Sequence, residues 1–239
     1  MNYKITILRK KSSEEPSYEQ TFAFESSDDA QTVAAALILI NRSDLIDIEG
    51  KKADPIAWEC SCLQKKCGAC AMVINGKPGL ACDTKLKEAA DKNGNIRIEP
   101  LRKFPTVRDL ICDRSILWEN LKIIKAWIED GDDVTLKEDK ETVLFDAGRC
   151  LQCGCCLEIC PNFYAGGKLM GMSAMVPVSG MLQKLTPQQS KELRKLYSKH
   201  IYNGCGKSFS CRDICPAGLD IEKLMVNSNA VMLWKHLIK

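Results

Sequence analysis

The cysteines are the residues of this sequence whose number and spacing point to chemistry. There are 14 in 239 residues, about 6% of the chain and below the roughly 8–10% of a small disulfide scaffold. Most of them fall into three regularly spaced groups. Thiolates at such spacings form disulfides in exported proteins, bind structural zinc, or hold iron–sulfur clusters. These three interpretations compete for the same residues.

The first group has the spacing C-x4-C-x2-C and gains a fourth cysteine after eleven further residues: Cys62, Cys67, Cys70 and Cys82. A plant-type [2Fe–2S] ferredoxin loop has this spacing. The backbone must approach the sulfides of the flat cluster closely, and the small residues Gly68, Ala69 and Ala71 permit that approach. We therefore expect a [2Fe–2S] cluster. A zinc site is the alternative, because zinc also needs only four cysteines.

The second group reads C-x2-C-x2-C-x3-C-P, the run of bacterial ferredoxins: Cys150, Cys153, Cys156 and Cys160-Pro161. In such runs the fourth cysteine binds the neighbouring cluster, so a second run is required. A third group supplies it downstream, as Cys205, Cys211 and Cys215-Pro216. It departs from the template at one position, because Ser208 stands where the second cysteine belongs.

This exchange of the fourth cysteine assigns the ligands of two further clusters. We expect a [4Fe–4S] cluster held by Cys150, Cys153, Cys156 and Cys215. The other cluster is then held by Cys160, Cys205 and Cys211. Three thiolates leave one corner of a cubane without its sulfur ligand, which favours a [3Fe–4S] cluster. The alternative is a four-iron cluster with Ser208 oxygen or another group as fourth ligand.

The remaining cysteines lie outside the three patterns: Cys60, Cys112 and Cys155. We interpret them as buried small hydrophobic residues and not as ligands. No thiol has a recognisable activating neighbour, and His200 and His236 have no partner pattern. The sequence therefore predicts no catalytic residue in this chain.

The residues around the first group alternate as strands do. We expect strands at 3–9 and 18–25, a helix at 32–40 capped by Asp28-Asp29, and short strands at 71–74 and 96–98 with a turn at Asn75-Gly76. After Leu101 no strand pattern of comparable strength appears. Helical spacing marks 115–130, stopped by Gly131, then 187–202 and 220–237, while the acidic stretch 129–141 suggests a solvated loop. The expected domains are 1–105 and 106–239.

Composition and charge narrow the class of protein. Hydrophobic residues at 45% and charged residues at 27% are typical of a soluble globular chain, and the net charge of +3 gives no argument for binding nucleic acid. Residues 1–11 lack an apolar core of signal-peptide length, so neither export nor a disulfide framework is expected. The longest apolar-rich stretch, 169–183, is too short to span a membrane and is interrupted by Gly171, Pro177 and Gly180.

In this order, one [2Fe–2S] loop, one [4Fe–4S] run and one cysteine-deficient run resemble the iron–sulfur subunit of succinate dehydrogenase and fumarate reductase. The resemblance spans nearly the whole chain. The stretches that carry it are residues 67–72, Asn75-Gly76, Leu80-Ala81-Cys82, Pro100-Leu101, 104–110, 150–156 and 215–219.

The resemblance implies an α+β chain in which an N-terminal β-grasp ferredoxin domain precedes an all-α helical ferredoxin domain. It also implies a partner subunit carrying FAD, where succinate and fumarate interconvert. Electrons then pass through the [2Fe–2S], [4Fe–4S] and [3Fe–4S] clusters toward a quinone held by membrane anchor subunits, with or without haem. We expect the chain to be peripheral on the cytoplasmic side of the membrane, with no substrate site of its own.

Three segments depart from the family pattern. Residues 63–66, Leu-Gln-Lys-Lys, occupy a loop where an Arg-x-Gly type sequence is usual. Tyr164 and Ala165 follow Cys160-Pro161 where quinone-reactive members carry tryptophan, and Gly206 stands where histidine is frequent. The usual quinone contacts are not reproduced. The alternative function is an electron-transfer subunit of a related flavoenzyme that acts on another organic acid with a non-quinone partner.

Two surfaces have more than one interpretation. Met170, Met172, Met175 and Met181 either pack around the clusters or form an apolar face that docks an anchor subunit. Lys184, Lys191, Arg194, Lys195 and Lys199 form a basic helix face that is either solvated or directed at anionic lipid or an acidic partner.

Overall fold

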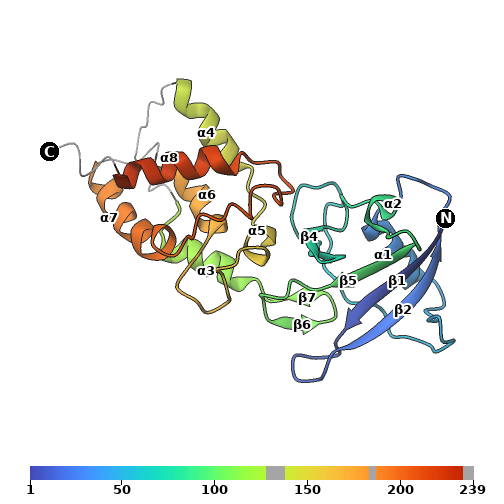
Figure 1. The fold of residues 1–239 in the computed structure, drawn as a ribbon. Coiled ribbons are helices and arrows are strands. Elements are labelled where there is room, and N and C mark those ends of the chain that lie inside the picture. Colours follow the sequence, from blue (N-terminus) through green and yellow to red (C-terminus); the bar gives the residue numbers. More distant parts are fainter. Residues whose placement is uncertain (128–137, 183–186, 234–239) are drawn as a thin grey trace. The chain divides into compact units, whose positions relative to one another are not determined.

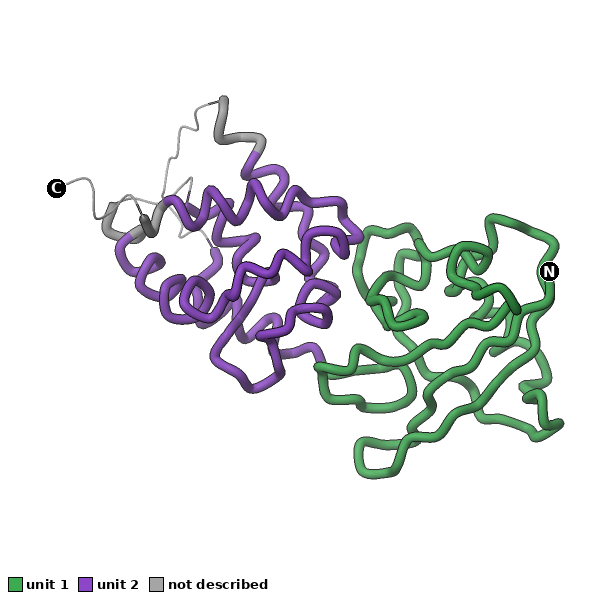
Figure 2. The backbone as a smooth tube through the Cα atoms, in the orientation of Figure 1, with its two compact units in different colours: residues 1–113 green, residues 114–239 purple. Residues whose placement is uncertain are grey.

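The chain divides into two compact units, Met1–Asp113 and Arg114–Lys239 (Figure 2). The computed structural model describes residues 1–127, 138–182 and 187–233. The division falls somewhat after the boundary at residue 105 that the sequence suggested. The reason is a small hairpin, β6 (Thr106–Arg108) and β7 (Ile111–Cys112), which folds with the first unit.

The first unit is built on a five-stranded sheet (Figure 1). Its strands are β1 (Asn2–Arg9), β2 (Tyr18–Glu25), β3 (Ala71–Ile74), β4 (Lys77–Leu80) and β5 (Asn95–Glu99), in the order β2-β1-β5-β3-β4. Only β1 and β5 pair in parallel. Alternate residues of β1 are buried, as the sequence pattern predicted. Asn75 and Gly76 have positive φ angles of 46° and 78°, which make the tight turn between β3 and β4.

Helix α1 (Val33–Arg42) contacts β2 and buries Val33, Ala36 and Leu37. The expected cap at Asp28-Asp29 was wrong. The Thr32 hydroxyl oxygen accepts from the Ala35 N–H at 3.2 Å and caps the helix, whereas Asp28 closes the turn before it. A short helix, α2 (Leu86–Ala89), follows Cys82.

A buried ion pair ties β1 to the end of the first unit. Arg9 Nε donates to Asp109 Oδ1 at 2.9 Å, and their side chains are 2% and 1% exposed. Asp109 also accepts from the backbone N–H groups of Lys10 and Ala57, at 3.0 and 2.9 Å. The other two guanidinium nitrogens also donate: Nη1 to Gln20 Oε1, and Nη2 to the carbonyl oxygens of residues 54 and 55. The network thereby fixes the segment that leads into the first cysteine loop.

In the second unit every element that the structure describes is helical. The helices are α3 (Ser115–Ile123), α4 (Glu138–Gly148), α5 (Cys155–Glu158), α6 (Met172–Met181), α7 (Pro187–Tyr197), the π-helix η1 (Ser198–Tyr202) and α8 (Ile221–Leu233). The helices expected at 187–202 and from 220 onward are confirmed, although residues 234–237 lie outside the described part. In the described residues, no helix has both the length and the apolar character to span a bilayer.

Two sequence expectations for this unit were wrong. Helix α3 ends at Ile123 and not near residue 130, because Lys125 adopts a left-handed φ of 55°. Helix α4 begins at Glu138, inside the acidic stretch that suggested a loop; residues 128–137 of that stretch lie outside the described part. Its charged first turn hid a helix whose apolar residues begin only at Val143.

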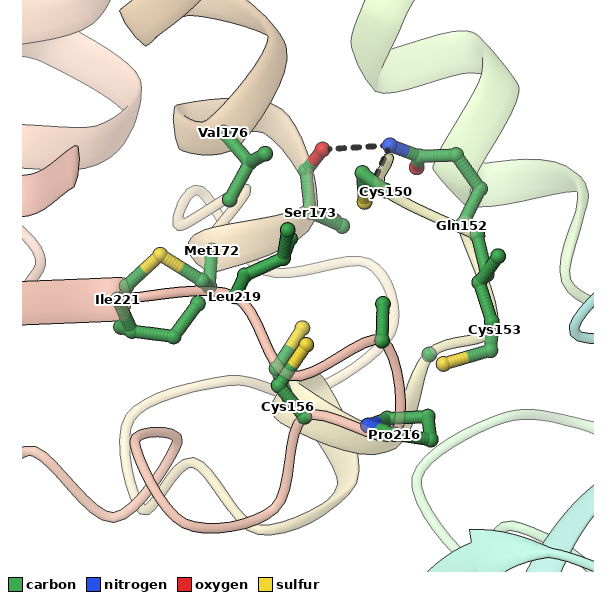
Figure 3. Close-up of a pocket in the computed structure, with 14 residues that line it drawn as sticks. Cys150, Gln152, Cys153, Cys156, Met172, Ser173, Val176, Pro216, Leu219 and Ile221 are labelled. Atoms are coloured by element: carbon green, nitrogen blue, oxygen red, sulfur yellow. Dashed lines mark hydrogen bonds between the residues drawn. The ribbon is translucent and has the colours of Figure 1, made fainter. Parts of the chain in front are cut away.

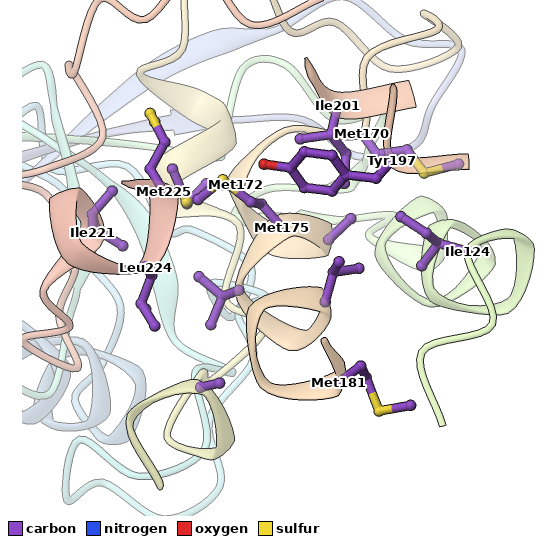
Figure 4. Packing of buried hydrophobic residues seen from close by; sticks show 14 of the residues in the cluster. Ile124, Met170, Met172, Met175, Met181, Tyr197, Ile201, Ile221, Leu224 and Met225 are labelled. Atoms are coloured by element: carbon purple, nitrogen blue, oxygen red, sulfur yellow. The ribbon is translucent and has the colours of Figure 1, made fainter. Parts of the chain in front are cut away.

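Helix α6 forms the centre of the second unit (Figure 4). The four methionines of the apolar segment, Met170, Met172, Met175 and Met181, are between 2% and 8% exposed. Their interpretation as packing residues is confirmed, and the alternative of an apolar docking face was wrong. Lys191, Lys195 and Lys199 of the basic face are exposed, and the side chain of Lys184 lies outside the described part.

Candidate metal centres

The first group of cysteines gathers around the β3–β4 hairpin. Cys70 directly precedes β3 and Cys82 follows β4, and the Ala81 N–H donates to the Cys70 carbonyl at 3.0 Å. The other two cysteines lie in the loop before β3. Backbone N–H groups converge on the sulfurs: those of Gln64 and Lys66 donate to Cys62 Sγ at 3.3 Å, and that of Lys65 donates to Cys82 Sγ at 3.4 Å.

The two ends of this site have opposite electrostatics. The N–H donors of Gln64 and Lys66 lower the pKa of Cys62 to about 7. Burial raises the pKa of Cys70, and the neighbouring Cys82 and Cys67 raise it further. A thiol that is costly to ionise alone becomes a thiolate when metal replaces its proton. The donor set, with amides aimed at sulfur, fits an iron–sulfur cluster.

The second site is a pocket in the helical unit. It is lined by four cysteines from two distant segments, Cys150, Cys153, Cys156 and Cys215. Met172 and Val176 of α6 supply an apolar wall, together with Leu219, just before α8, and Ile221, its first residue (Figure 3). Gly154, with a φ of 89°, turns the chain into α5 so that Cys156 lies on its first turn.

The third group meets the end of the second. Burial, together with the charges of the nearby Cys160, Cys205 and Cys215, raises the pKa of Cys211 to about 11. Asn162 Nδ2 donates to the Gly204 carbonyl at 3.0 Å and so joins the segment after Cys160 to the segment before Cys205. Cys215 thus lines the pocket of the second group, and Cys160 and Cys215 are both among the charges that act on Cys211 of the third.

The polar groups near these sites carry charge and hydrogen bonds that sequence reasoning did not anticipate. The hydrogen bond with the Cys155 thiol is the main cause that lowers the pKa of Cys153 to about 7, and the charge of Arg114 contributes. Arg114 Nη1 also donates to the Cys153 carbonyl at 3.3 Å. Gln152 Nε2 donates to Cys150 Sγ at 3.3 Å. Nothing in the spacing of the sequence signals either contact.

The cysteines outside the three groups differ in exposure. Cys112 and Cys155 are buried, as expected. Cys60 is exposed, so its interpretation as a buried thiol was wrong: the loop before Cys62 carries it at the surface. Within the part of the chain that is described, no three His, Cys, Asp or Glu side chains are arranged to hold a single metal ion. An iron–sulfur cluster has several metal atoms, so it does not need such an arrangement.

The segments that depart from the family pattern lie at the surface or are crowded. Tyr164 is 66% exposed. A Cβ atom on Gly206 would lie 2.8 Å from Asn162 Nδ2, so a larger side chain there requires Asn162 to move. The Ser208 side chain is exposed, and its hydroxyl lies 3.1 Å from that of Ser210. In the loop 63–66 the side chains differ from the family pattern, but the backbone N–H groups of residues 64–66 still donate to cysteine sulfurs.

Comparison with known proteins places both halves of the chain. A 2Fe-2S iron-sulfur cluster binding domain matches residues 4–119, and a 4Fe-4S dicluster domain matches residues 146–219. The succinate dehydrogenase iron–sulfur subunit of Bacillus subtilis is 30% identical over 231 residues, covering 91% of this chain and 87% of that protein. The fumarate reductase iron–sulfur subunit of Haemophilus influenzae is 29% identical, covering 75% and 78%.

A solved structure agrees at the level of the fold. The Mycobacterium smegmatis Sdh1 complex in the apo form contains a chain that superposes with a TM-score of 0.78 at 18% identity, covering 98% of this chain and 97% of that one. The matched domains bind 2Fe-2S and 4Fe-4S clusters, and the relatives are matched over most of their length. The chain therefore belongs to the family of the iron–sulfur subunits of succinate dehydrogenase and fumarate reductase, the electron-transfer subunits of those oxidoreductase complexes.

Proposed function

We propose that this chain relays electrons between an FAD-containing flavoprotein subunit and a quinone held at a membrane anchor. The observation that carries the proposal is the grouping of Cys215 with Cys150, Cys153 and Cys156 around one pocket, while Cys160 acts electrostatically on Cys211. That crossing of the two runs is what a pair of adjacent cubane-type clusters requires. The proposal therefore names the cysteine ligands of each cluster, in addition to the cluster domains that the family shares.

The proposed ligand sets are those expected from the spacing. Cys62, Cys67, Cys70 and Cys82 hold [2Fe–2S]; Cys150, Cys153, Cys156 and Cys215 hold [4Fe–4S]; Cys160, Cys205 and Cys211 hold [3Fe–4S]. The hydroxyl of Ser208 lies against Ser210, which supports three protein ligands at the last site. When bound, the three clusters supply a series of one-electron carriers.

The protein's own residues orient the sulfurs and shield them. Backbone N–H groups from residues 64–66 stabilise the thiolates of the first site. Apolar side chains of α6 and of the segment before α8 line the second site. We also propose that the first unit is a β-grasp ferredoxin fold, supported by its mixed sheet order and the contact of α1 with β2, and that the second is a helical ferredoxin domain.

The partners belong to the proposal as well. A flavoprotein provides the site for succinate or fumarate, and anchor subunits keep this chain peripheral on the cytoplasmic side of the membrane. Purification of the chain from its source tests this. An FAD subunit and a quinone-binding anchor are expected to co-purify, whereas an FAD subunit with a thiol or ferredoxin partner and no anchor would favour the alternative function.

Iron and acid-labile sulfide analysis tests the cluster content. We expect about nine iron atoms per chain, and a three-iron signal in the low-temperature paramagnetic resonance spectrum of the oxidised protein. Stoichiometric zinc without sulfide would overturn the proposal.

Single substitutions test the crossing of the two runs. Cys215→Ser is expected to weaken the four-iron signal more than the three-iron signal. Cys160→Ser is expected to weaken the three-iron signal more than the four-iron signal. Cys60→Ser is the matched control, because Cys60 is exposed and outside the ligand sets, and it should leave both signals intact. The reverse pattern, with Cys160→Ser removing the four-iron signal, would refute the crossed assignment.

A further inference from the structure

Gln152 places a side-chain amide against the sulfur of a cysteine in the second group. Its Nε2 lies 3.3 Å from Cys150 Sγ and 2.9 Å from the carbonyl oxygen of Ser173, and it donates to both (Figure 3). Cys150 and Ser173 both line the pocket of the second site. The amide therefore bridges a proposed cluster ligand and helix α6.

The chemistry of the two acceptors fixes which end of the amide faces the sulfur. A carbonyl oxygen only accepts, so the nitrogen must face Ser173, and a flipped amide would bring two acceptor oxygens together. In this orientation Gln152 Oε1 is buried without a hydrogen-bond partner. A buried unpaired acceptor destabilises a fold, and natural proteins concentrate such exceptions at functional sites.

Pro177 explains why the Ser173 carbonyl accepts from this amide. In a regular helix the N–H of residue 177 would bond to the carbonyl of residue 173, but proline has no N–H. Ser173 is 2% exposed, so its carbonyl is largely hidden from water. The Gln152 amide satisfies the acceptor that the helix leaves open, and the same contact holds its second N–H toward Cys150 Sγ.

We propose that Gln152 is a positioning residue that raises the reduction potential of the [4Fe–4S] cluster by donating Nε2–H to the Cys150 thiolate. The inference rests on the ligand set proposed above. Reduction adds one electron to the cluster and neither forms nor breaks a covalent bond. The added negative charge spreads onto the thiolate sulfurs, so a donor held at one of them stabilises the reduced form more than the oxidised form.

The test is a redox titration of the cluster-loaded complex, poised with dithionite and mediators and followed by paramagnetic resonance of the reduced four-iron cluster. Gln152→Leu removes the donor and fills similar space. We expect its cluster to bind the electron about threefold to tenfold more weakly, which lowers the midpoint by roughly 28 to 59 mV for one electron. The midpoint of the [2Fe–2S] cluster in the same molecule is expected to stay unchanged.

Gln64→Leu is the matched control. Gln64 follows Cys62 by two residues, as Gln152 follows Cys150, and its backbone N–H donates to the cysteine sulfur, but its side chain is exposed. Removing that side chain should leave the four-iron midpoint in place. Gln152→Glu is the second test variant, because it is nearly isosteric and replaces the donor with an acceptor; its four-iron midpoint should also fall.

Iron and sulfide content separate loss of the cluster from a change of its potential. If the unsubstituted complex shows no reduced four-iron signal, the proposed ligand set is wrong. If that signal is present and a fully loaded Gln152→Leu or Gln152→Glu variant keeps the original midpoint, the inference about Gln152 is wrong while the ligand set stands. An equal shift of both clusters would also overturn it, because Cys150 is the one proposed ligand to which the Gln152 amide donates.

Discussion

Removing Arg9 should weaken the first unit far more than removing an exposed charge does. In Arg9→Met the Asp109 carboxylate stays buried with the N–H groups of Lys10 and Ala57 but without its cation. Breaking one side of a buried pair costs about 3–5 kcal/mol, since the orphaned charge remains desolvated. The other acceptors of Arg9 include the carbonyls of residues 54 and 55, and both of those residues are exposed, so water can replace that part of the network.

Hydrogen exchange followed by mass spectrometry on the cluster-loaded chain measures this loss. At about 1.4 kcal/mol per factor of ten, the expected cost speeds exchange of the β1 amides by roughly 10² to 4 × 10³-fold, up to the rate of the unfolded chain. Peptides of α6 belong to the second unit and serve as an internal reference. Lys51→Met is the matched control, because Lys51 and Glu49 are 72% and 66% exposed, and no measurable change is expected.

The double variant Arg9→Met/Asp109→Asn separates the charge from the packing. Asparagine tolerates the left-handed φ of 45° at position 109 and leaves no buried charge behind. Exchange in β1 should therefore be slower in the double variant than in Arg9→Met. The reasoning fails if Arg9→Met speeds exchange by less than about tenfold, or if the double variant exchanges as fast as the two single effects combined.

Three further predictions concern single positions. Gly94→Ala and Gly50→Ala both force an L residue into a positive φ, which is expected to cost roughly 1–2 kcal/mol of stability at Gly50. At Gly94 the new Cβ would also lie 2.5 Å from a backbone oxygen, so thermal unfolding should show a larger loss of stability there. Ser208→Cys should add about one iron per chain and abolish the three-iron signal; unchanged iron would contradict the three-thiolate assignment. In the metal-free chain near pH 7, Cys62 is about half thiolate because its pKa is lowered to about 7. Iodoacetamide should therefore modify Cys62 well before the buried Cys70, whose pKa is raised. The rate of modification at Cys62 should fall as the pH drops below 7.

The spacing of the cysteines was sufficient to predict the 2Fe-2S and 4Fe-4S domains that the family models match, because ligand geometry restricts how far apart thiolates lie along a chain. Strands β1, β2, β3 and β5 also followed from sequence, and in β1 the reason is that alternate burial leaves a period of two. The short strands β4, β6 and β7 were not expected. The cap of α1, the end of α3 and the start of α4 did not follow. Each depends on one residue's backbone or on packing against another element, as when Lys125 turns left-handed after α3. The exposure of Cys60 depends on the loop's path in the same way.

Backbone strain in this chain concentrates where sulfur is held. Nine non-glycine residues in the described part have positive φ, and five of them lie in or beside the cysteine runs: Leu63, Lys65, Gln152, Lys207 and Phe209. Bulky residues adopt this conformation at a cost, and the surrounding structure must hold them there. The benefit at the first site is visible in the hydrogen bonds, since the left-handed residues 63 and 65 alternate with the residues whose N–H groups point at Cys62. A turn of alternating handedness points its amides at anionic groups, here those of residues 64 and 66 at Cys62 and that of residue 65 at Cys82. The side chains in the loop are then free to vary, and this explains how residues 63–66 depart from the family pattern while the amides still serve the cysteines.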